Sequence, residues 1–97
     1  MKAPPQKEAP FLRQVQQIAR LYGWLDYHTH DSRRSNPGFL DLFLTRPPRI
    51  VISELKTDKG RLRPEQKIWL DTLGKCPGVE VYLWRPRDWD TIVEILK

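Results

Sequence analysis

With 97 residues, and 17 Lys and Arg against 12 Asp and Glu for a net charge of +5, the chain suits one small domain with a polyanionic partner such as nucleic acid. The sequence holds no run of 18 or more apolar residues and no apolar leader, and its single cysteine excludes an internal disulfide and a multi-cysteine zinc site. We therefore expect a soluble, cytoplasmic protein with no membrane partner.

The first half of the chain predicts a short arm, a helix and three strands. Residues 1–8 are polar and proline-rich, which predicts a flexible N-terminal arm, and residues 9–97 are expected to form a single domain. Apolar residues at helical spacing, closed by Gly23, predict a helix over residues 9–22. The remaining predictions here are strands at 24–29, 39–45 and 50–56, with a polar loop at 30–38.

The second half predicts a helix, a strand and a final helix. Pro64 suits the first turn of a helix that Gly74 ends. An apolar stretch predicts a strand at 79–84, and Asp88 is a suitable N-cap for the last helix. The expected element order is αβββαβα, which is an α/β fold.

Residues 38–60, "GFLDLFLTRPPRIVISELKTDKG", contain two apolar strands that each carry one carboxylate. A turn centred on Pro47 and Pro48 places Asp41 directly opposite Glu54 on the neighbouring strand. Opposed side chains of an antiparallel pair have Cβ atoms roughly 4.5–5.5 Å apart, so the two carboxylates are close enough to hold one divalent cation. Both faces of this hairpin are largely apolar, which predicts helices on both sides of it.

Lys56 returns to the face of Glu54 because side chains alternate along a strand. Two acids and a lysine on one face supply what phosphodiester hydrolysis requires, namely a metal site and a positive charge beside the phosphate. The alternative is that Glu54 and Lys56 are solvated charges at a strand end and that Asp41 pairs with a nearby arginine.

The quoted run, with "PEQ" after it, "YHTHDSRRSNPG" before it and "VEVYLWRPRDWD" downstream, resembles the PD-(D/E)XK nuclease superfamily, and in particular its VRR-NUC branch. The resemblance extends from about residue 8 over nearly the whole chain. It implies a restriction-endonuclease-like core with a central four-stranded mixed sheet flanked by helices. It also implies an Mg²⁺- or Mn²⁺-dependent endonuclease acting on duplex, branched or junction DNA.

The resemblance carries site roles to individual residues. Asp41, Glu54 and Lys56 match the D…ExK signature, although Leu40 stands where that signature has proline. The further implied site residues are Gln66 on the helix after the signature and, as metal ligands beside the two acids, the Leu55 backbone carbonyl and Glu8.

Two basic segments flank the expected site and are suited to phosphate contacts. They comprise His30, Ser32, Arg33 and Arg34 before the Asp41 strand, and Lys59, Arg61 and Arg63 after Lys56. A merely solvated loop is the alternative for the first segment. The small core and many large aromatic residues favour a homodimer. Two other classes stay open: a nucleic-acid-binding module without chemistry, and an interaction subunit of a larger complex.

Overall fold

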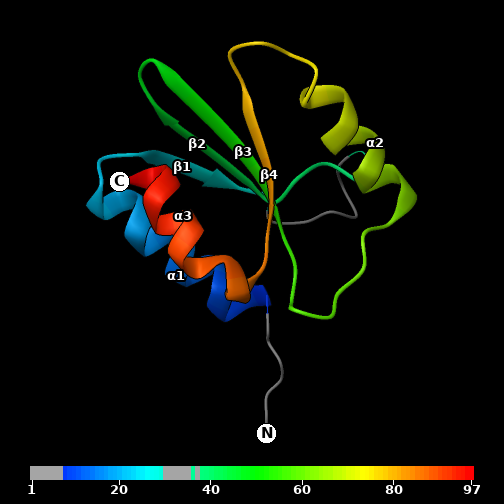
Figure 1. Ribbon diagram of the computed structural model, residues 1–97, viewed down its shortest axis with the longest axis horizontal. Helices are drawn as coiled ribbons and strands as arrows, with labels where there is room; N and C mark the ends of the chain where they lie inside the picture. The colour runs from blue at the N-terminus through cyan, green and yellow to red at the C-terminus, as the bar shows by residue number, and fades with distance from the viewer. Residues whose placement is uncertain (1–7, 30–35, 37) are drawn as a thin grey trace, which may run out of the picture.

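The computed structural model describes residues 8–29, 36 and 38–97, and its elements follow the predicted order αβββαβα (Figure 1). They are α1 (Glu8–Leu21), β1 (Leu25–His28), β2 (Leu42–Arg46), β3 (Arg49–Leu55), α2 (Pro64–Leu73), β4 (Glu80–Trp84), the short 3-10 helix η2 (Pro86–Asp88) and α3 (Trp89–Leu96). The predicted arm at residues 1–8 lies outside the described residues, except that Glu8 begins α1. Within the described part of the chain, no helix is both long and apolar enough to cross a membrane.

The four strands form one mixed sheet in the order β1-β2-β3-β4. The first three strands pair antiparallel, whereas β3 and β4 are parallel because the chain crosses back through α2 between them. Leu44 pairs with Val51 across the β2–β3 hairpin, which is the register that a turn centred on Pro47 and Pro48 requires. The predicted register of this hairpin is confirmed.

Helices cover both faces of the sheet, as the apolar hairpin predicted (Figure 1). α1 and α3 lie together on one face, and α2 lies on the other side (Figure 1). The main core fills the space between the sheet and the α1–α3 layer; its buried residues are Phe11, Val15, Ala19, Trp24, Leu42, Leu44, Val51, Leu55, Trp84, Ile92 and Leu96. Because side chains alternate along β3, Ile52 and Glu54, which alternate with those core positions, face α2.

The tip of the β2–β3 hairpin is anchored to the end of α3. Trp24 donates from Nε1 to the Leu96 carbonyl at 2.8 Å, and the guanidinium groups of Arg46 and Arg49 lie 4.6 and 4.9 Å from the centroid of its ring. Arg46 and Arg49 donate to carbonyl oxygens of the last turn of α3 and its C-terminal flank. These contacts satisfy carbonyls that a helix end leaves unpaired, and they fix the hairpin against the helical layer.

Two helix ends follow the signals read from the sequence. Gly23 has φ +87°, the left-handed conformation in which glycine ends a helix readily. Asp88 is the N-cap residue of α3, as expected, but its carboxylate accepts a hydrogen bond of 2.8 Å from the backbone N–H of Arg85 instead of a bond from α3. The Asp88 side chain therefore closes the η2 turn.

Candidate active site

Asp41 and Glu54 lie where the β2–β3 pairing ends. The ladder closes at Leu42 and Ser53, and Asp41 is the next residue before β2. Its Oδ2 atom accepts a hydrogen bond of 2.9 Å from the Leu55 backbone N–H. The Asp41 side chain therefore binds the backbone of β3 beside Glu54, which places the two carboxyl groups next to each other at this end of the sheet.

Glu54 is only 1% exposed, and its two oxygens have different surroundings. Oε2 accepts a hydrogen bond of 2.8 Å from Gln66 Nε2 and lies 3.5 Å from Lys56 Nζ. Oε1 is buried without a hydrogen-bond partner among the described residues. A buried carboxylate oxygen in that state is unfavourable unless a proton shared with Asp41 or a bound cation completes it.

The surroundings of Glu54 raise the pKa of its carboxyl group to about 8. Burial is the main cause, because it disfavours the charged form, and the negative charge of Asp41 acts in the same direction. Lys56 opposes the rise without cancelling it. The side chain therefore holds a proton at neutral pH unless a further positive charge is bound beside it.

Helix α2 supplies the group that orients Glu54. Gln66 is buried, and its side chain donates to Glu54 from Nε2 while its Oε1 accepts from the Arg63 backbone N–H at 2.9 Å. Gln66 thus joins the start of α2 to the acid, and both ends of its amide have partners.

The loop that carries Asp41 is also packed against α2. Gly38 has φ +89°, and a Cβ atom placed there would lie 2.6 Å from the backbone carbon of Glu65. Next to it, the rings of Phe39 and Trp69 meet edge to face with centroids 5.0 Å apart. α2 therefore contacts the segment before Asp41 as well as Glu54, and so joins the two acids.

The donor set fits a hard divalent cation, since it consists of the Asp41 and Glu54 carboxylates, and Glu54 Oε1 is buried without a partner among the described residues. The Leu55 carbonyl points to the same side of β3 as its N–H, which is the side of Asp41. Among the described residues, no group of three or more His, Cys, Asp and Glu side chains is arranged to hold a metal ion. The predicted third acid, Glu8, is the first residue of α1. The structure describes its place in the helix but not its side chain.

The predicted phosphate-binding residues divide into two groups. Lys59, Arg61 and Arg63 are exposed on the loop between β3 and α2. His30, Ser32, Arg33 and Arg34 lie outside the described residues.

Sequence reasoning missed the contacts of the segment after β4. Arg85 donates from Nη1 to the carbonyls of Thr57 and Gly60, at 2.6 Å each. Arg87 contacts Asp58 on the same loop through its backbone and its side chain. No local signal identifies these contacts, because the partners are more than 20 residues apart in the chain and meet only through the parallel β3–β4 pair.

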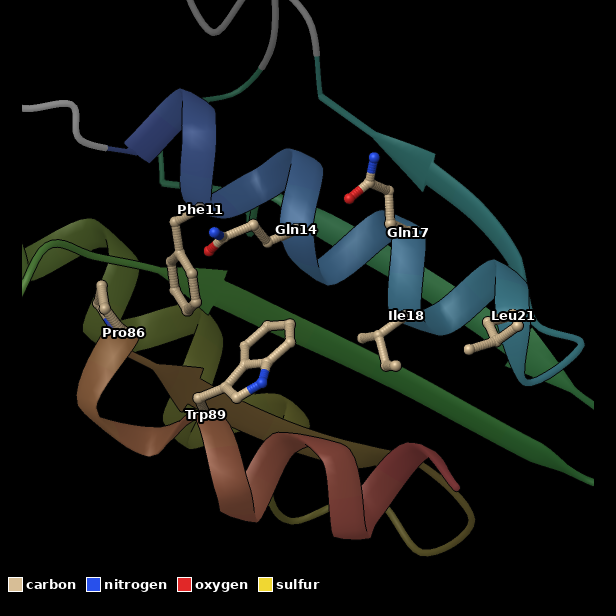
Figure 2. A pocket seen from close by; sticks show the side chains of 7 residues that line it. All are labelled: Phe11, Gln14, Gln17, Ile18, Leu21, Pro86 and Trp89. Atoms are coloured by element: carbon tan, nitrogen blue, oxygen red, sulfur yellow. The ribbon is translucent and has the colours of Figure 1, made fainter.

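A hollow of about 430 Å³ lies on the other side of the sheet from the two acids, between α1 and the start of α3. Figure 2 shows Phe11 and Trp89 pointing into it. Its lining comprises Phe11, Gln14, Gln17, Ile18, Leu21, Pro86 and Trp89. None of these seven residues is acidic or basic, and the hollow is separate from the chemistry of Asp41, Glu54 and Lys56.

The fold and this end of the sheet define a class of protein. An αβββαβα domain with one mixed sheet, whose second and third strands bring Asp41, Glu54 and Lys56 together, has the core and signature of the PD-(D/E)XK nuclease superfamily. The model of the VRR-NUC domain family matches residues 6–88, and the chain belongs to this family. No curated protein and no solved structure matches the chain significantly.

Proposed function

We propose that this protein is an Mg²⁺- or Mn²⁺-dependent endonuclease that hydrolyses DNA phosphodiester bonds. The observation that carries the proposal is the pair of acids with Lys56 beside them, in which Glu54 keeps one buried oxygen without a partner among the described residues. Membership of the VRR-NUC family supports the same chemistry.

Asp41, Glu54 and the Leu55 carbonyl would hold the divalent cation, with Glu8 as a further candidate. The bound cation would supply Lewis-acid polarisation of the scissile phosphate. Gln66 keeps Glu54 Oε2 occupied, which leaves Oε1 for the cation. Lys56 carries a positive charge 3.5 Å from Glu54, where it can stabilise negative charge that develops on the phosphate oxygens.

We further propose that DNA is held through its backbone. Lys59, Arg61 and Arg63 are exposed on the loop that follows Lys56, which suits contact with phosphates on either side of the cleaved bond. His30, Ser32, Arg33 and Arg34 are proposed to act in the same way from the segment before Asp41. Phosphate contacts position the duplex without reading bases, so selectivity for branched or junction DNA would come from the shape of the substrate.

Cleavage assays with single-residue variants test the proposed chemistry. Linear, flapped and four-way-junction DNA should be cut in the presence of Mg²⁺ or Mn²⁺ and left intact in EDTA. Asp41→Asn, Glu54→Gln and Lys56→Ala should each lower the cleavage rate by about 100-fold or more, since each removes a metal ligand or a stabilising charge. Circular dichroism should find all three folded.

The outcome also decides between an enzyme and a binding module. A module that keeps the fold without chemistry would bind DNA equally well with and without metal, and none of the three variants would change that. An interaction subunit of a larger complex would show no DNA affinity even at low salt. A variant that cleaves at the wild-type rate would remove its residue from the proposed site.

A further inference from the structure

The side chain of Arg85 lies against a tight turn in the loop between β3 and α2, which carries Lys59, Arg61 and Arg63 and which we call the basic loop. The backbone N–H of Gly60 donates to the Thr57 carbonyl at 3.2 Å, which closes a turn over residues 57–60. Arg85 Nη1 donates to that same Thr57 carbonyl and to the Gly60 carbonyl. One guanidinium nitrogen therefore binds the first and the last residue of the turn.

A second arginine holds the middle of the turn. The Arg87 backbone N–H donates to Asp58 Oδ1 at 3.1 Å, and its Nη1 donates to the Asp58 carbonyl at 3.0 Å. Arg85 is itself fixed, because its own backbone N–H donates to Asp88. Four hydrogen bonds thus connect the segment after β4 to three residues of the turn, and we call this set the loop clamp.

The clamped turn leads directly to the exposed cations proposed to contact DNA. It lies between Lys56 and the basic side chains of Arg61 and Arg63. A Cβ atom at Gly60 would lie 3.5 Å from Lys56 Cδ, so the turn also packs on the lysine stem. The guanidinium of Arg85 is directed to loop carbonyls, whereas Arg61 and Arg63 are exposed to solvent.

We propose that Arg85 is a positioning residue that holds the basic loop in its DNA-binding conformation before DNA arrives. This inference rests on the proposed function, because it concerns how the same site engages a phosphodiester backbone. A loop ordered in advance does not lose conformational entropy on binding, so affinity rises without any additional contact. Arg85 acts through the loop and does not itself touch phosphate.

The salt dependence of DNA binding distinguishes positioning from direct contact. Each lost phosphate contact lowers the magnitude of the negative slope of log K against log salt by about 0.9, whereas disorder in an unbound loop leaves the number of contacts in the complex unchanged. Arg85→Met keeps much of the aliphatic stem and removes the donors. We expect it to weaken affinity about fivefold or more, with the wild-type slope.

Arg61→Met is the matched control, because it removes the same charge from an exposed position on the same loop. We expect it to lower the magnitude of the slope by about 0.9. Hydrogen exchange completes the comparison: the Gly60 amide should exchange about tenfold faster or more in Arg85→Met and at the wild-type rate in Arg61→Met.

Two variants of Asp58 test the clamp independently if Arg85→Met does not fold. Asp58→Asn and Asp58→Ala remove the same negative charge, but only the asparagine keeps an oxygen that can accept the Arg87 N–H. We expect Asp58→Ala to bind DNA more weakly than Asp58→Asn. Equal affinity of the two would count against the clamp.

The possible outcomes separate this inference from the proposed function. Wild-type protein that neither binds nor cleaves DNA would overturn both. If the wild type binds DNA, then unchanged affinity in Arg85→Met, or a slope reduced as in Arg61→Met, overturns the positioning role alone. Weaker binding at an unchanged slope together with faster exchange supports it.

Discussion

At the scale of single residues, the buried carboxyl group of Glu54 contributes stability that falls as the pH rises. The folded protein binds one more proton at this carboxyl than the unfolded chain does between about pH 4.5 and 8, because burial and Asp41 raise its pKa. The contribution of Glu54 to the free energy of unfolding is therefore complete below pH 4.5. It is lost as the pH rises through 8.

Comparing wild type with Glu54→Gln isolates this effect, because the variant cannot titrate at this position and every other group is shared. We expect the wild type to lose about 1–3 kcal/mol of unfolding free energy relative to the variant between pH 5.5 and 8.5. Urea unfolding at several pH values measures the difference. Parallel pH profiles would show that the Glu54 carboxyl does not have a raised pKa.

At the scale of elements, α2 must pack closely on the segment before β2, because this contact holds Asp41 beside Glu54. Gly38 lies at that contact, and Gly78 offers a matched comparison because it has the same φ of +89° with nothing within 4 Å of an added Cβ. Alanine at either position bears the strain of a left-handed backbone, but only alanine at 38 collides with the backbone of Glu65.

We expect Gly38→Ala to lower the free energy of unfolding by about 2–4 kcal/mol and Gly78→Ala by about 1 kcal/mol. The Gly38 variant should also lose cleavage activity, because displacement of α2 withdraws Gln66 from Glu54. Denaturant unfolding and the cleavage assay measure the two effects. Equal destabilisation by both substitutions would contradict a close contact between Gly38 and α2.

At the scale of the whole molecule, we propose that the protein is a homodimer. Leu25 and Tyr27 on the edge strand β1 and Ile68 on α2 are large apolar side chains that are 75%, 62% and 66% exposed. Leu25 and Tyr27 lie on the Asp41 side of the sheet, since they pair with Thr45 and Phe43. A second copy covering this surface would bring two sites to one branched substrate with matching two-fold symmetry.

Light scattering measures the mass directly. We expect about twice the 11.5 kDa of one chain at micromolar concentration. Tyr27→Lys should shift that mass toward the monomer, because it places a charge in the apolar contact. A monomeric mass that persists with DNA bound would contradict the homodimer. Each molecule would then act independently and nick only one strand.

The sequence by itself determined the features that depend on neighbouring residues. Helix and strand order followed from apolar spacing and from Gly and Pro positions, and the range of α2 was predicted to the residue. The hairpin register followed from the turn at Pro47 and Pro48, because one turn sets every pair along two strands. That register was sufficient to place Asp41 beside Glu54.

Only the tertiary structure decided how distant segments complete the site. Gln66 meets Glu54, and Arg85 meets the turn at residues 57–60, because α2 packs on the sheet and β4 pairs parallel to β3. The raised pKa of Glu54 likewise depends on burial by several elements at once. Contacts and desolvation of this kind depend on how separate elements pack, and local propensity carries no information about that packing.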